Sequence, residues 1–133
     1  MATMPAVDLF SSMIRLGPDG DARAEERRMS PDLDGWTVVT LHVDSGADAH
    51  PESWECHPDG EEVMCVLTGT VRVHFRSETD PRDPDGEPAA RLGPGTACVI
   101  PRGRWHRITV EEPSDIMTFS RIAGTRMERR TGW

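Results

Sequence analysis

The hydrophobic positions of this chain fall into short runs with the period of β-strands. Residues 36–43 (WTVVTLHV) alternate and are rich in β-branched side chains, and residues 62–67 (EVMCVL) form a mostly apolar run. The same criteria predict further strands at residues 70–75, 97–100, 105–110 and 115–122. Twelve Gly and eleven Pro are scattered between the runs rather than massed, which is typical of an all-β domain.

The connections between these runs are predicted from their polar residues. Thr68 and Gly69 separate two apolar runs by a short step and predict a hairpin turn. Residues 77–88 (SETDPRDPDGEP) predict a polar loop.

The two ends of the chain carry weaker patterns. Residues 21–28 (DARAEERR) fit one or two turns of helix or a solvated loop equally well, because short charged helices are marginal. The tail 124–133 is interpreted as a frayed terminus in preference to an arm that packs on a second subunit. We therefore expect one domain over residues 1–133, with a barrel core at about 34–123 and peripheral segments at 1–33 and 124–133.

Composition and charge narrow the possible functions. The chain has 133 residues and a net charge of -8, which disfavours binding to nucleic acid because phosphate backbones are repelled. It contains no Lys or Tyr, so no Schiff base or phenolic acid is available. No run approaches the ~18 apolar residues of a membrane span, and no secretory signal is visible. Three cysteines without paired spacing (Cys56, Cys65 and Cys98) fit reduced thiols in a cytoplasm.

Two segments concentrate residues that could bind a metal. In the first, WECHPDGEE, Glu55 and His57 are two residues apart, so their side chains leave the same face of an extended chain. A Pro-Asp-Gly turn then leads into a strand that opens with Glu62. In the second, GTACVIPRGRWH, His106 follows a bend made by Pro and Gly. If these strands line one barrel, two imidazoles and one or two carboxylates converge inside it.

The two segments resemble the two motifs of the cupin family. The first motif is G, five residues, H-x-H, three or four residues, E, six residues, G, and His57, Glu62 and Gly69 stand at its spacing. The second is G, five residues, P-x-G, two residues, H, three residues, N, and four residues match it without a gap: Gly95, Pro101, Gly103 and His106. The resemblance, to small single-domain bacterial cupins, implies an all-β double-stranded β-helix or jelly-roll barrel of antiparallel strands. It also implies a homodimer formed through sheet edges.

The sequence departs from the cupin motifs at three positions. Ala49 stands in place of the opening Gly, Glu55 in place of the first His, and Val110 in place of the final Asn. The second departure resembles a subgroup with W-E-x-H-P-x-G-D/E-E at this place. Glu55 is then either an anionic ligand or a free side chain beside a three-ligand site.

The candidate metal ligands are Glu55, His57, Glu62 and His106. They are expected to hold one divalent ion (Fe, Mn, Ni or Zn), with Fe or Mn slightly favoured. Glu61 should point to solvent, because neighbouring residues of a strand face opposite ways.

Other residues are candidates for the pocket or are assigned no role. Met64 and Val66 should face the same side of their strand as Glu62. Arg104, Ile108 and Val110 should likewise face the same side as His106. All five therefore line either a substrate pocket or ordinary core. Arg104, and with less support Arg121, could grip an anionic substrate. The remaining histidines, His42, His50 and His74, are not expected to be ligands. Of these, only His50 could approach the metal, because it is near the site in the sequence.

Three functions are compatible with this site. The favoured hypothesis is a metal-dependent enzyme acting on a small organic molecule, with a dioxygenase first and a lyase, isomerase or cyclase next. The alternatives are a non-catalytic binding or sensor domain and a structural barrel with an empty site. A pocket filled by Met64, Val66 and Ile108 would count against an enzyme.

Overall fold

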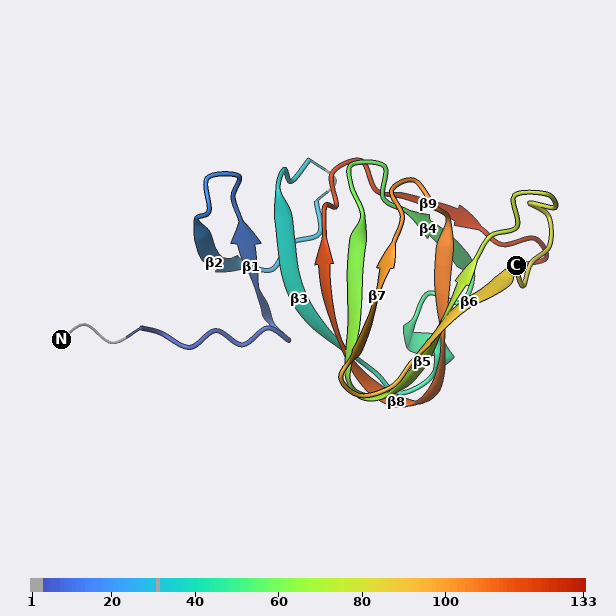
Figure 1. The fold of residues 1–133 in the computed structure, drawn as a ribbon, viewed down its shortest axis with the longest axis horizontal. Coiled ribbons are helices and arrows are strands. Elements are labelled where there is room, and N and C mark those ends of the chain that lie inside the picture. Colours follow the sequence, from blue (N-terminus) through green and yellow to red (C-terminus); the bar gives the residue numbers. More distant parts are fainter. Residues whose placement is uncertain (1–3, 31) are drawn as a thin grey trace.

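The computed structural model describes residues 4–30 and 32–133, and it confirms the all-β fold class (Figure 1). The described residues form one short 3-10 helix, η1 (Gly46–Asp48), and nine strands. The strands are β1 (Ser12–Leu16), β2 (Ala22–Glu26), β3 (Trp36–Val43), β4 (Ser53–Cys56), β5 (Glu62–Phe75), β6 (Glu87–Leu92), β7 (Thr96–Ile100), β8 (His106–Ser120) and β9 (Arg126–Arg129). In the described part of the chain, no helix has the length and apolar character needed to cross a membrane.

The two long strands β5 and β8 organise the sheet, and all strand pairs are antiparallel. One path runs β2-β1-β3-β8-β4-β9, while β5 pairs with β6, β7 and β8. Because β8 joins β3 and β4 to β5, the sheet curves round and encloses an interior (Figure 1).

Strand pairing brings the two motif segments together. Glu55 of β4 lies directly opposite His106 of β8. The backbone N–H of Gly103 donates to the carbonyl oxygen of His57 at 3.0 Å. The two segments, about fifty residues apart in the chain, are therefore held side by side by backbone hydrogen bonds.

The hairpin predicted at Thr68 and Gly69 is wrong. Residues 62–75 form one continuous strand, and the pairing of β5 with β8 shifts register around these two residues. Gly69 has a φ of 84°, and a Cβ there would lie 2.2 Å from the carbonyl oxygen of Pro113. The glycine thus bends the strand at a close approach of two backbones instead of reversing the chain.

Other boundaries are partly confirmed. The strand over residues 36–43 is confirmed, and that over 97–100 extends by one residue to give β7. Residues 105–110 and 115–122 were expected as two strands, but residues 106–120 form the single strand β8. The polar loop is shorter than expected, because β6 begins at Glu87.

Two peripheral segments form strands that the sequence did not indicate. Residues 22–26 are neither helix nor loop but strand β2, which pairs with β1. The tail does not fray, because β9 pairs with β4, and the Arg130 guanidinium is buried and donates to the carbonyl oxygens of Pro51 and Pro84.

The interior has two apolar clusters. The larger lies between β5, β6, β7 and β8 and includes Val66, Val71, Val73 and Ile116, all at most 1% exposed. The smaller packs Met13 of β1 and Leu33 against Val39 and Ile122. The N-terminal hairpin is therefore anchored by buried side chains as well as by its backbone pairing with β3.

Candidate metal centre

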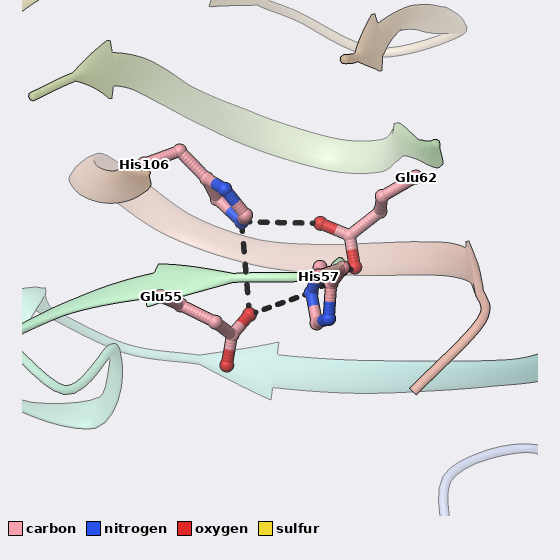
Figure 2. A group of neighbouring side chains, drawn as sticks. All are labelled: Glu55, His57, Glu62 and His106. Atoms are coloured by element: carbon pink, nitrogen blue, oxygen red, sulfur yellow. Dashed lines mark hydrogen bonds and ion pairs between the residues drawn. The ribbon is translucent and has the colours of Figure 1, made fainter. Parts of the chain in front are cut away.

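Glu55, His57, Glu62 and His106 point toward one another inside the barrel (Figure 2). One ligand atom from each residue can be chosen so that all four lie within 4.8 Å of one another. The Nε2 of His57 lies 3.0 Å from Glu55 Oε1 and 3.2 Å from Glu62 Oε2. The Nε2 of His106 lies 3.6 Å from Glu55 Oε1 and 3.5 Å from Glu62 Oε1. The structure thus brings together all four residues singled out in the sequence.

Hydrogen bonds on the far side of each ring orient the two imidazoles. Thr125 Oγ1 donates to the carbonyl of Ile122, so it is left to accept from Nδ1–H of His57 at 2.9 Å. Nδ1–H of His106 donates to the carbonyl oxygen of Arg104 at 2.9 Å. Both Nδ1 atoms keep their protons, and both Nε2 atoms face the cluster as the atoms available to a metal.

Glu62 is oriented in the same way. The hydroxyl of Ser120 donates to its Oε2 atom, which leaves Oε1 directed at His106. Glu62 Oε1 and His106 Nε2 are both buried and have no hydrogen-bond partner among the described residues. Two buried, unsatisfied atoms of opposite character that face each other are expected at a site built for another group.

The electrostatics of the cluster are dominated by the facing charges. Burial disfavours all four charged forms, but hydrogen bonds and attraction between the opposite charges outweigh it. The two carboxylates raise the pKa of His57 to about 9 and that of His106 to about 10. The two imidazolium rings lower the pKa of Glu62 to about 2 and hold that of Glu55 well below its usual range.

Glu55 differs from its three companions in exposure. Its side chain is 36% exposed, whereas those of His57, Glu62 and His106 are 6%, 6% and 3% exposed. It sits at the open side of the cluster, with one oxygen within 3.6 Å of both Nε2 atoms. Glu55 therefore does not hang free in the solvent.

The donor set fits a divalent metal ion. Neighbouring ligands of a six-coordinate ion at about 2.1 Å stand about 3.0 Å apart, close to the distances within this cluster. Two imidazoles and two carboxylates suit Fe, Mn, Ni or Zn, and four protein ligands leave an octahedral ion with open positions. The ion when bound would supply Lewis acidity or redox chemistry.

A cavity of about 600 Å³ adjoins the cluster. Its walls include the alternate residues Val39, Leu41 and Val43 of β3, with Ile116 of β8 and Met127 of β9. This volume lies within the range of about 300–1,000 Å³ that is usual for small-molecule pockets. The four polar side chains thus lie at one end of a largely apolar chamber.

The structure separates the residues expected in the pocket. Met64 and Ile108, for which pocket wall and ordinary core were both left open, line the cavity. Val66 is fully buried in the larger core cluster and Val110 packs against it, so neither belongs to the described cavity lining. Arg104 was only a candidate for the interior, and its guanidinium is paired with Glu78 outside the cavity, because the chain still bends at this point and β8 begins only at His106.

Five more residues considered in the sequence lie outside the cluster. Arg121 is paired with Asp59 rather than facing the cavity. Glu61 is exposed, as the strand alternation predicted. His74 hydrogen-bonds Thr109 away from the cluster, whereas two of the histidines assigned no ligand role line the cavity: His42 and His50.

Sequence reasoning missed the residues that hold the cluster in place. Thr125 and Ser120 lie outside both motifs, and no spacing rule links them to the ligands. The contribution of β3 to the wall had a signal, because Val39, Leu41 and Val43 alternate along a strand that was predicted.

Comparisons with known proteins support the fold. No family model matches the chain, and no curated protein is similar enough to match it. An uncharacterized conserved protein with a double-stranded β-helix domain from Klebsiella pneumoniae superposes with a TM-score of 0.56 at 18% identity, covering 74% of this chain and 79% of that one. A cupin superfamily protein from Desulfitobacterium hafniense gives a TM-score of 0.50 at 18% identity, with coverages of 68% and 70%.

A larger protein also contains this architecture. A mutant of oxalate decarboxylase from Bacillus subtilis superposes with a TM-score of 0.52 at 16% identity, covering 72% of this chain but 24% of that one. These identities bear on the fold alone. With nine antiparallel strands, two motif segments side by side and these structural likenesses, the chain has the cupin fold, the double-stranded β-helix.

Proposed function

We propose that this protein is a metal-dependent enzyme that acts on a small organic molecule bound in the barrel. The observation that carries the proposal is the pair of buried atoms without partners, Glu62 Oε1 and His106 Nε2, at the end of an open cavity. These two atoms form an ion pair at 3.5 Å, too long for a good hydrogen bond, so a purely structural barrel would leave both poorly satisfied. The cavity is not filled by Met64 and Ile108, which form part of its wall, and this supports a site that admits a ligand.

The reaction class that we propose first is oxygenation. Four protein ligands would leave an octahedral ion with room for a substrate and for O2. A lyase, isomerase or cyclase, in which the ion polarises a substrate oxygen, is the next candidate. The likeness to an oxalate decarboxylase is consistent with an enzyme on this fold, but it does not extend to oxalate as the substrate.

Nitric oxide, a surrogate for O2, tests this proposal without knowledge of the substrate. The protein would be loaded anaerobically with Fe(II) and exposed to nitric oxide, and the high-spin iron–nitrosyl signal would be recorded by electron paramagnetic resonance. We expect the signal in the parent protein and its loss in His106→Ala. If the parent protein binds iron but gives no signal, the open positions are absent and the storage or sensor alternative replaces the enzyme.

The predicted homodimer and cytoplasmic location stay predictions. Strand β2 ends the path β2-β1-β3-β8-β4-β9, so one side of its backbone is unpaired in the sheet. It carries Arg23, Glu25 and Glu26, and such charges commonly limit edge-to-edge pairing. Light scattering coupled to gel filtration distinguishes a dimer from a monomer that is independent of concentration.

A further inference from the structure

The charges around the cavity restrict what can bind in it. Away from the four candidate ligands, the exposed surface of the wall is mostly apolar and comes from aliphatic side chains such as Val39, Leu41, Val43, Ile116 and Ile122, and several Ser and Thr residues add uncharged hydroxyls. Such a wall stabilises apolar ligand surface by about 25 cal/mol per Å² removed from water. An anionic ligand would instead need a cation that is free to meet it.

The arginines at the cavity are already engaged. Arg27 donates from one Nη2 atom to the backbone carbonyl of Leu9 and, at 2.9 Å, to that of Thr40. Arg107 donates to the carbonyl of Asp85 at 2.9 Å, and its guanidinium lies over the ring of Trp54. The Nε atoms of both arginines have no hydrogen-bond partner among the described residues, but they are buried, so neither side chain can meet an incoming carboxylate without breaking these contacts.

The histidines at the rim are paired with acids. His42 lies 2.8 Å from Asp44 Oδ1 and 2.7 Å from Asp115 Oδ1. His50 lies 3.7 Å from Glu52. Among the described residues of the lining, the only other cationic groups are the two histidines of the metal site.

The metal site itself offers no excess positive charge. Two carboxylates, Glu55 and Glu62, neutralise a divalent ion completely, whereas a site with His in place of Glu55 would keep one positive charge. Without metal, two carboxylates and two histidines give at most a neutral cluster, whichever protonation state the rings adopt. Asp48 on the rim and the overall charge of -8 further repel anions from the mouth.

We propose that the ligand of this cavity is an uncharged, mainly apolar organic molecule that presents one hydroxyl or carbonyl oxygen to the four ligands, and that carboxylates are excluded. The proposal deepens the proposed function and rests on it for the polar end of the ligand. The discrimination by charge holds with or without metal. Glu55, which stands where the cupin motif has His, is then the residue that determines specificity.

Benzamide and benzoate test this proposal, because they have nearly the same shape and differ by one full charge. Their dissociation constants would be measured by calorimetry or NMR titration on the zinc-loaded protein and on the metal-free protein. We expect benzamide to bind at least about tenfold more tightly than benzoate in both forms, the size of effect that one unfavourable charge has at a partly buried site.

A matched pair of variants links the preference to the cavity. Leu41 and Leu67 are 41% and 43% exposed, but only Leu41 lines the cavity, so an arginine at either position is tolerated at the surface. Leu41→Arg supplies a free cation at the mouth and should strengthen benzoate binding by about tenfold. Leu67→Arg adds the same charge elsewhere and should leave the ratio of the two affinities unchanged.

The outcomes separate this proposal from the proposed function. If benzoate binds as tightly as benzamide, or if benzamide binds to neither form at millimolar concentration, the inference about the ligand is overturned. If zinc fails to bind while the metal-free protein still prefers benzamide, the metalloenzyme fails and the charge inference stands.

Discussion

Metal binding should release about two protons from this protein near neutral pH. The carboxylates of Glu55 and Glu62 raise the pKa of His57 to about 9 and that of His106 to about 10. At pH 7.5 both rings are then at least about 95% protonated, and the proton on each Nε2 must leave before a metal can bind there. Two ordinary histidines with a pKa of about 6.5 would together release about 0.2 protons at the same pH.

The same reasoning fixes the dependence of affinity on pH. Between pH 7 and 8.5 the apparent association constant should rise by about two powers of ten per pH unit, because two protons compete with one ion. Above about pH 11 the dependence should vanish, since both rings are then neutral before the metal arrives.

Isothermal titration calorimetry with Zn(II), repeated in buffers of different ionisation enthalpy, counts the protons directly. Glu55→Gln removes one carboxylate partner from both rings, so it should release fewer protons than the parent protein. His74→Ala, which alters a histidine outside the cluster, should release the same number. A release of about 0.2 protons at pH 7.5, or an affinity independent of pH between 7 and 8.5, would refute the assigned electrostatics.

Three further outcomes are expected. Thr125→Val removes the acceptor that orients His57 and should weaken metal binding about 10- to 100-fold in competition titrations. Thr109→Val, beside a histidine outside the cluster, should leave the affinity unchanged, and equal effects of the two variants would contradict the role of Thr125. Gly69→Ala places a Cβ 2.2 Å from a backbone oxygen at a φ of 84°, and it should lower the free energy of unfolding by about 2–4 kcal/mol in urea titrations. Gly93→Ala, where a Cβ meets open space, should change that free energy by less than about 1 kcal/mol. The raised pKa values of His57 and His106 stabilise the metal-free protein, fully below about pH 6.5 and progressively less as the pH rises through about 9 and 10. A melting temperature of the metal-free protein that increases between pH 6.5 and 10 would contradict these pKa values.

The sequence predicted the strands whose own residues determine their structure. Residues 36–43 alternate with β-branched side chains, and β3 forms over the same range. Strand β2, with the sequence ARAEE, has no such pattern, and it is a strand because it pairs with β1. Likewise β9 (RMER) depends on its pairing with β4, which no local propensity expresses.

The predicted hairpin failed for a related physical reason. A glycine with positive φ fits a turn and a bulge equally well, and the choice depends on whether β8 continues alongside β5. Only the tertiary partner could decide this, because Gly69 must also leave room for the backbone at Pro113.

The ligands were predictable where the supporting groups were not. Glu55, His57 and Glu62 converge through strand alternation and a turn, both of which are local, whereas His106 was identified by its match to the second cupin motif. Thr125 and Ser120 reach the cluster from far along the chain, and their roles depend on a packing that spacing does not encode.

Metal content tests the central claim most directly. The protein would be purified anaerobically and analysed by plasma mass spectrometry, beside His106→Ala and Glu55→Ala. We expect about one Fe, Mn, Ni or Zn per chain in the parent protein and none in His106→Ala, which removes a buried ligand. Glu55→Ala then shows whether the more exposed carboxylate is required. No metal in the parent protein, even after reconstitution with each of these ions, would contradict the account.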